Sequence, residues 1–264
     1  MTLTMKDLFF LVVLDPLYNA LVFLVSIVPG GDVGIAVILL TILVKLLLFP
    51  LSIKAVRTQL VMQELQEPLK LIQEKYKDDR QQQGLEIMAL YRAKGVNPFS
   101  SILLLLIQLP IIFGLYWVFY KGGLPDIKPE WLYSFVTEPS VAAISMMFLG
   151  IVDMGGRSVV LSLLAGVTQF IQAKLSFPPL PPKKEGEEPS FKDDLQRNLQ
   201  LQMKYGLPVI VAIISYTISS AVALYWVTSN IFTIGQELYV RRHIKKPHQR
   251  AKEEAEAEAE AKIE

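Results

Sequence analysis

The stretch VGIAVILLTILVKLLLFPL, residues 33–51, decides the class of this protein. Its only charged residue is Lys45. A helix rises 1.5 Å per residue, so about 20 apolar residues cross the hydrocarbon core of a bilayer. The stretch therefore predicts an all-α, polytopic membrane protein.

Composition supports the membrane class. Hydrophobic residues make up 52% of the 264 residues, and the mean hydropathy is +0.39. The net charge is only +1, and the charges lie in blocks between apolar runs. The sequence therefore shows no strong pattern for nucleic-acid binding. There is no cysteine, and both histidines, His243 and His248, follow the last apolar segment. We expect neither an enzyme, a metal site nor a cofactor.

Five core transmembrane helices are predicted. Besides residues 33–51 they are residues 98–121, 158–175, 205–219 and 220–240. The last two form one apolar stretch that we divide at the polar pair Ser219 and Ser220, because together they are too long for one crossing.

Two other apolar stretches are less suited to crossing a bilayer. Residues 8–28 are interrupted by Asp15, Pro16 and Asn19, and residues 141–152 are too short, so both predict interfacial helices. The first gives an N-terminal interfacial amphipathic region over residues 1–32, with a sixth span as the alternative. This region has no basic start and no small-residue cleavage motif, so we expect no processing.

Lysine and arginine residues predict the orientation. Basic residues concentrate in the segments 52–97, 176–204 and 241–264, whereas the segment 122–157 has few. Because basic loops stay in the cytoplasm, we expect the N-terminus outside, the C-terminus inside and residues 122–157 as an extracytoplasmic loop.

Lys45 is the first candidate for function. A charge at the centre of a span costs about 2.5–3.5 kcal/mol, so something must compensate for it. One interpretation is a hydrated cavity that Lys45 lines together with the span residues Gln108, Gln169 and Gln172. The alternatives are a lysine that reaches the cytoplasmic interface and glutamines that bond neighbouring helices.

The segment over residues 52–97 is the second candidate. Apolar residues recur at helical spacing on both sides of Lys77, Asp78 and Asp79, which predicts a cytoplasmic helical hairpin. The alternative is a solvated spacer without a partner. The proline-rich part of 176–204 predicts a flexible cytoplasmic loop, and residues 241–264 predict a charged tail of low complexity.

Four blocks of this chain, taken together, resemble the core of the YidC/Oxa membrane protein insertases in order and spacing. The blocks are LVKLLLFPLSIKAVRTQLVMQELQEPLKLIQEKYKDD, MALYRAKGVNPFSSILLLLIQLPIIFGLYWVF, GVTQFIQAKL and ALYWVTSNIFTIGQ. The resemblance covers about residues 33–240. It implies five core spans and a hydrophilic intramembrane groove through which hydrophobic segments of new proteins reach the bilayer.

The resemblance also implies site residues. The position of the groove's positive residue, usually arginine, matches Lys45, which keeps the charge but lacks the guanidinium fork. On the third span Gln172, or Gln169 about one turn earlier, matches a further groove position, and Trp226 matches one on the last span. The hairpin residues expected to recruit substrate are Arg57, Leu65, Tyr76 and Met88.

The implied partners are nascent membrane proteins and the lipid bilayer of a bacterial plasma membrane. The ribosome and the Sec translocon stay open as partners, because the glutamates of the tail oppose binding to phosphate. A small-solute transporter or channel is the alternative function, although several paired intramembrane charges would be typical of it.

Overall fold

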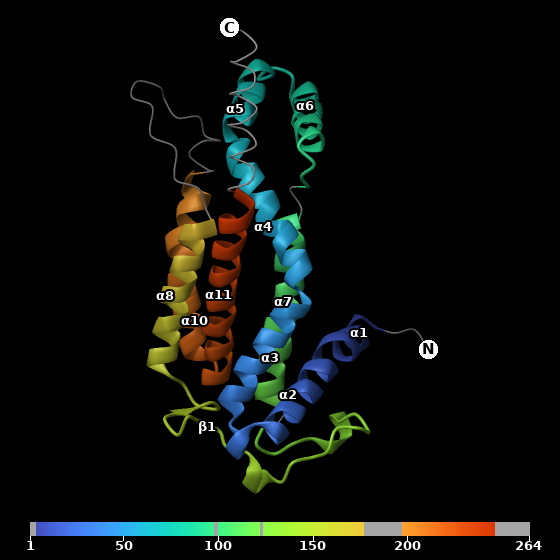
Figure 1. The fold of residues 1–264 in the computed structure, drawn as a ribbon, viewed down its shortest axis with the longest axis vertical. Coiled ribbons are helices and arrows are strands. Elements are labelled where there is room, and N and C mark those ends of the chain that lie inside the picture. The colour runs from blue at the N-terminus through green and yellow to red at the C-terminus, as the bar shows by residue number, and fades with distance from the viewer. Residues whose placement is uncertain (1–3, 98–99, 122–123, 177–196, 246–264) are drawn as a thin grey trace. The chain divides into compact units, whose positions relative to one another are not determined.

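The computed structural model describes residues 4–97, 100–121, 124–176 and 197–245. Within these ranges the chain is almost entirely helical, which confirms the all-α class (Figure 1). The helices are α1 (Met5–Phe9), α2 (Asp15–Ile27), α3 (Val33–Leu47), α4 (Phe49–Glu64), α5 (Gln66–Lys75), α6 (Arg80–Ala93), α7 (Ser100–Lys121), α8 (Val159–Ser176), α10 (Leu207–Thr217) and α11 (Ser220–Val240), and the strands are β1 (Met147–Phe148) and β2 (Val152–Asp153). Most of the loop predicted over 176–204 and most of the tail predicted over 241–264 lie outside the described residues.

The chain divides into two compact units. The first unit comprises Met1–Leu47 and Leu106–Thr233, and the second comprises Leu48–Leu105 and Ile234–Glu264. The first therefore holds α1–α3, α8, α10 and most of α7 and α11. The second holds α4–α6, the first residues of α7 and the last residues of α11.

Length and hydropathy identify several of the predicted spans. Among the described residues, Asp7–Ile27 and Val159–Ser176 are each long and apolar enough to cross a membrane. Helices α3 and α4 pass the same test as a pair with a break between them, and Leu106–Phe119 is a shorter apolar helix. Because Asp7–Ile27 fits a span as well as an interfacial helix, the number of spans stays a prediction.

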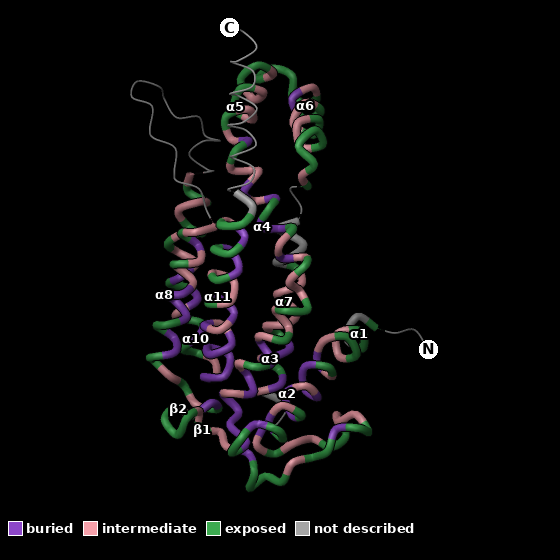
Figure 2. Tube along the Cα trace, in the orientation of Figure 1, coloured by how far each residue is buried: buried purple, intermediate pink, exposed green. Residues whose placement is uncertain are grey.

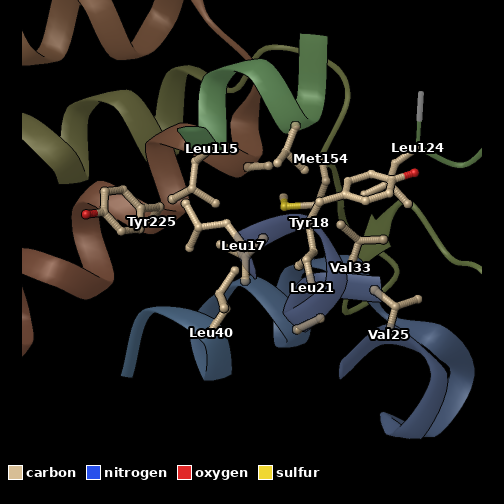
Figure 3. Packing of buried hydrophobic residues seen from close by; sticks show 14 of the residues in the cluster. Leu17, Tyr18, Leu21, Val25, Val33, Leu40, Leu115, Leu124, Met154 and Tyr225 are labelled. Carbon is tan, nitrogen blue, oxygen red and sulfur yellow. The ribbon is translucent and has the colours of Figure 1, made fainter. Parts of the chain in front are cut away.

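The core of the first unit lies where α2, α3, α7 and α11 meet. Figure 3 shows Leu17 and Tyr18 of α2 packed near Leu40 of α3 and Leu115 of α7. The outer faces are apolar too, since Leu43 of α3 and Leu163 of α8 are exposed. Helices that are apolar on both faces are typical of a bundle with a buried side and a lipid side (Figure 2).

Small residues let the helices of the first unit approach closely. A Cβ atom added at Gly166 of α8 would lie 2.9 Å from the Cβ atom of Ala212 and 3.2 Å from the carbonyl oxygen of Pro208. Both contacts are on α10, and Figure 1 shows the two helices side by side. Close backbone approach at small residues is how helices associate in lipid, where the hydrophobic effect adds little.

The segment between α7 and α8 corrects one prediction from the sequence. The expected interfacial helix over 141–152 is wrong, because these residues form a single 3₁₀ turn, Val141–Ala143, followed by the antiparallel β1–β2 hairpin. Gly150 takes φ +72° in the hairpin turn. Backbone pairing with the residues before α3 replaces helical bonds, as Ser145 N donates to Gly31 O at 2.9 Å.

Helix α2 fastens the earlier part of that segment. Asn19 Nδ2 donates to Trp131 O at 2.8 Å, and Tyr133 N donates to Asn19 Oδ1 at 2.6 Å. The amide of Lys128 donates to the Tyr18 hydroxyl at 2.8 Å. Asn19, one of the polar residues that interrupt the apolar run of α2, therefore bonds the segment between α7 and α8.

The second unit contains a helical hairpin. Helices α5 and α6 lie against each other, and Gln83 Nε2 donates to Gln73 O at 2.9 Å. Asp79 begins α6 by accepting from Gln82 N at 2.9 Å, an N-cap that ends the turn after α5. Gly95 follows α6 with φ +64°, a conformation typical of the residue after a helix.

We expect Gly166→Ala to lower the free energy of unfolding by about 1–3 kcal/mol, because the added methyl group overpacks the contact between α8 and α10. The measurement is the thermal unfolding midpoint in detergent. Gly235→Ala is the matched control, since a Cβ atom there meets nothing within 4 Å. Equal midpoints for Gly166→Ala and the control would contradict the close packing.

Candidate functional site

Lys45 lies in the last turn of α3 and its side chain reaches two other helices. Lys45 Nζ donates to Thr233 Oγ1 of α11 at 3.2 Å and to Gln108 Oε1 of α7 at 3.5 Å. Both distances are long for hydrogen bonds from an ammonium group, so the contacts are weak. The ammonium group is half-buried and both of these acceptors are uncharged.

Gln108 is oriented by a buried tyrosine. Its Nε2 atom donates to the hydroxyl of Tyr225, and its Oε1 atom faces Lys45. Tyr225 is 2% exposed. In Figure 3 its hydroxyl points away from the other labelled side chains of the apolar cluster. A fixed Tyr225 therefore presents the carbonyl end of the Gln108 amide to the cation.

Thr233 is oriented in the same way. Its hydroxyl donates to Ser229 O at 2.8 Å, so the single hydroxyl proton is used within α11. The lone pairs of Thr233 Oγ1 are then left to accept from Lys45. We call Lys45, Gln108, Tyr225 and Thr233 the Lys45 cluster.

The sequence predicts Lys45 and Gln108 but misses their partners on α11. Tyr225, Ser229 and Thr233 are spaced by four residues, so they line one face of the helix. Each is a polar side chain in a helix whose first half is otherwise largely buried and apolar. This spacing is the signal that identifies a polar stripe in a span.

The two glutamines of α8 lie close to each other. Gln169 Nε2 donates to Gln172 Oε1 at 3.2 Å, so these two side chains bond each other. Helix α8 bonds α11 at the residue just before Gln169, where Asn230 Nδ2 donates to Thr168 Oγ1 at 3.2 Å. The bond between Gln169 and Gln172 therefore lies within α8, whereas Thr168 and Asn230 make the polar contact between α8 and α11.

The side chain of Trp226 packs against apolar residues. It is half-buried against the small cluster of Ala165, Val211 and Val227, together with Leu207. Its neighbour Tyr225 lies on the face of α11 that meets Gln108. Trp226 therefore contributes apolar surface beside α8 and α10.

The four predicted recruitment residues lie in the second unit and differ in exposure. Arg57 and Met88 are exposed and Tyr76 is half-buried. Leu65, at the junction of α4 and α5, is 3% exposed, so its side chain is packed in this structure. Leu85, which is 59% exposed on α6, was not in the predicted set.

The Lys45 cluster brings a cation together with uncharged hydrogen-bonding groups. It holds one cation, two hydroxyl groups and an amide, without the base that would activate a nucleophile. In the described part of the chain no three His, Cys, Asp or Glu residues gather to hold a metal ion. A carboxylate that reaches this cluster would meet a cation among weak, uncharged acceptors.

Comparison with known proteins shows the family of this chain. A family model described as 60Kd inner membrane protein matches residues 23–248. The membrane protein insertase YidC of Francisella tularensis subsp. novicida (strain U112) is 34% identical over 222 residues, which cover 83% of this chain and 34% of that protein. The proteins of the same name from F. tularensis subsp. tularensis (strain SCHU S4 / Schu 4) and subsp. holarctica (strain LVS) give the same values.

The chain spans about a third of the length of the curated relatives it matches. Within this chain, however, the family model covers nearly everything from α2 to the end of α11. The chain therefore belongs to the 60Kd inner membrane protein family, the YidC/Oxa family that its motifs predict.

Proposed function

We propose that this chain is a membrane protein insertase and chaperone, which moves hydrophobic segments of newly made proteins into the lipid bilayer. The names of its curated relatives support the proposal. The single observation that carries it is the Lys45 cluster, a cation inside apolar helices whose hydrogen bonds go to uncharged oxygens.

The proposed mechanism begins with electrostatic attraction. Among the described residues no carboxylate forms an ion pair with Lys45. Its half-buried ammonium group would attract a carboxylate, because two unit charges 4 Å apart interact by about 4 kcal/mol at an effective dielectric constant of 20. An acidic flank of a substrate would therefore be drawn toward Lys45. Gln108 and Thr233 bond Lys45 only weakly, so a carboxylate would displace them at low cost.

Apolar burial completes the proposed reaction. Once the flank has entered the polar cluster, the adjoining hydrophobic segment would slide sideways into lipid. Each Å² of apolar surface removed from water contributes about 25 cal/mol. No covalent step and no cofactor is required, so the protein would act as a binding and guiding device and not as an enzyme.

The proposed topology follows the basic residues. Five core spans would place the N-terminus and residues 122–157 outside, and the α5–α6 hairpin and the C-terminus in the cytoplasm. The family is one of inner membrane proteins, which agrees with a bacterial plasma membrane. Nascent membrane proteins would be the substrates, and the ribosome and the Sec translocon are further candidate partners.

The exposed side of the α5–α6 hairpin supports a role in recruiting substrate. Leu71 of α5 and Leu85 and Met88 of α6 are 66%, 59% and 42% exposed. Apolar side chains on a charged hairpin suit transient contact with a hydrophobic segment. Arg57 of α4 is a further exposed candidate.

The central test uses liposomes that contain the full chain and a small single-span protein with an acidic translocated flank. We expect Lys45→Ala to slow incorporation at least about fivefold, equivalent to about 1 kcal/mol, and Lys45→Arg to retain the wild-type rate, because charge and not fork geometry is needed. Protease protection of the translocated flank measures incorporation.

A substrate with a neutral flank is the control for this test. Its incorporation should change little in Lys45→Ala. Equal rates for wild type and Lys45→Ala on the acidic substrate would remove the electrostatic step. No incorporation by the wild type would overturn the insertase proposal itself.

The hairpin gives a second prediction. We expect the double substitution Leu85→Ser and Met88→Ser to weaken crosslinking between the hairpin and a nascent single-span protein severalfold, while the thermal midpoint stays unchanged because both side chains are exposed. The matched control is Gln81→Ser, an exposed polar residue of the same helix. Unchanged crosslinking in the double variant would refute recruitment by this surface.

A further inference from the structure

The turn of the β1–β2 hairpin carries exposed apolar side chains. Leu149 is 62% exposed and Ile151 is 77% exposed, and Gly150 lies between them. We call these two side chains the hairpin tip. Exposed turns are usually built from Gly, Asn, Asp, Ser or Pro. Two large apolar side chains here point to a surface that does not face water.

The backbone of the turn gives Leu149 an unfavourable conformation. Leu149 has φ +51° and Gly150 has φ +72°. Asn-Gly and Asp-Gly are the favoured pairs for such a turn, because Asn and Asp adopt positive φ more easily than Leu does. A polar residue would therefore suit both the conformation and exposure to water better than Leu149.

Hydrogen bonds fix the hairpin to the start of α3. Leu149 N donates to Asp32 Oδ2 at 2.8 Å, and the other carboxylate oxygen of Asp32 accepts from Ile35 N at 3.0 Å. A Cβ atom added at Gly34 would overlap the ring of Phe148, so that ring packs directly on the first turn of α3. One carboxylate thus caps a helix and holds the turn.

Residues after the hairpin fix it to α11 as well. Ala221 N donates to Met154 O at 3.1 Å, and Ser220 N donates to Gly156 O at 2.8 Å. Both donors belong to the first turn of α11. The hairpin is therefore held beside the first turns of α3 and α11.

An apolar surface continues from the hairpin into α8. Val159 and Val160 are 57% and 65% exposed in the first turn of α8, which is long and apolar enough to cross a membrane. The charged residues Asp153 and Arg157, both exposed, lie between the tip and α8 in the chain. Apolar side chains beside charged ones are the pattern of a segment at the boundary of headgroups and acyl chains.

We infer that the hairpin tip inserts Leu149 and Ile151 into the extracytoplasmic leaflet of the bilayer and so anchors the segment between α7 and α8 to lipid. The side of the membrane rests on the proposed topology, but contact with lipid does not depend on insertase activity. An anchored segment would keep the starts of α3 and α11 at a fixed depth while a substrate passes.

The chain contains no cysteine, so a single probe site needs no background substitution. The Ile151→Cys variant of the full chain is labelled with an environment-sensitive nitrobenzoxadiazole fluorophore. The labelled protein is then placed in vesicles of phosphatidylcholine and phosphatidylglycerol. Half of the vesicle samples also contain a lipid with a doxyl quencher near the headgroup. We expect blue-shifted emission and loss of at least half of the fluorescence with the quencher. Glu138→Cys, exposed in the same segment, is the control and should lose little.

Two results would overturn the inference. If the probe at position 151 emitted at as long a wavelength as the probe at 138, and were quenched as little, the hairpin tip would lie in water. Blue-shifted emission without quenching would place it against protein.

A second variant separates lipid contact from folding. Leu149→Asn, combined with the probe at 151, should reduce quenching at least twofold without lowering the thermal midpoint, because Asn accepts positive φ. Unchanged quenching would exclude Leu149 from the anchor. Rates of substrate insertion are measured in a separate assay. If that assay contradicted the insertase proposal, the quenching result would still test contact between the hairpin tip and lipid.

Discussion

The ammonium group of Lys45, held in an apolar bundle by uncharged oxygens, is the constraint on which the proposed function depends. A charge at this depth is costly unless polar groups surround it. Gln108 and Thr233 supply these groups, and each is oriented by a further hydrogen bond that uses its own proton elsewhere. The result is a cation that is tolerated but not neutralised, which is the electrostatic state that an acidic substrate flank requires.

The remaining architecture of the first unit keeps this cluster in place. Gly166 allows α8 to pack closely against α10, and Asn230 ties α8 to α11. At the ends of the helices, Asp32 and the residues around Met154 connect the starts of α3 and α11 through the hairpin. Two of the helices that contribute to the Lys45 cluster are therefore joined at one end by backbone hydrogen bonds as well as at the cluster itself.

Much of this could be predicted from the sequence, for physical reasons that also explain the misses. The helices follow from the length of their apolar runs, and Lys45 is conspicuous because charges inside such runs are rare. Its bond to Thr233 joins residues 188 positions apart, and the rotation of one helix against another is not encoded in hydropathy. For the same reason the bond between Gln169 and Gln172 could not be predicted from hydropathy, and their place in a groove stays a prediction. Residues 141–152 are apolar enough for a helix, but pairing with the backbone before α3 competes with helix formation.

Photocrosslinking from the substrate tests the central claim most directly. A stalled single-span protein with a photoreactive side chain beside its acidic flank would be activated in membranes that contain the full chain, and the adducts mapped by mass spectrometry. The account predicts adducts on the segments of α3, α7 and α11 around Lys45, Gln108 and Thr233, and their loss when the acidic residues are replaced by amides. Adducts confined to the exposed apolar face of α8, or unaffected by removing the acidic charge, would contradict it.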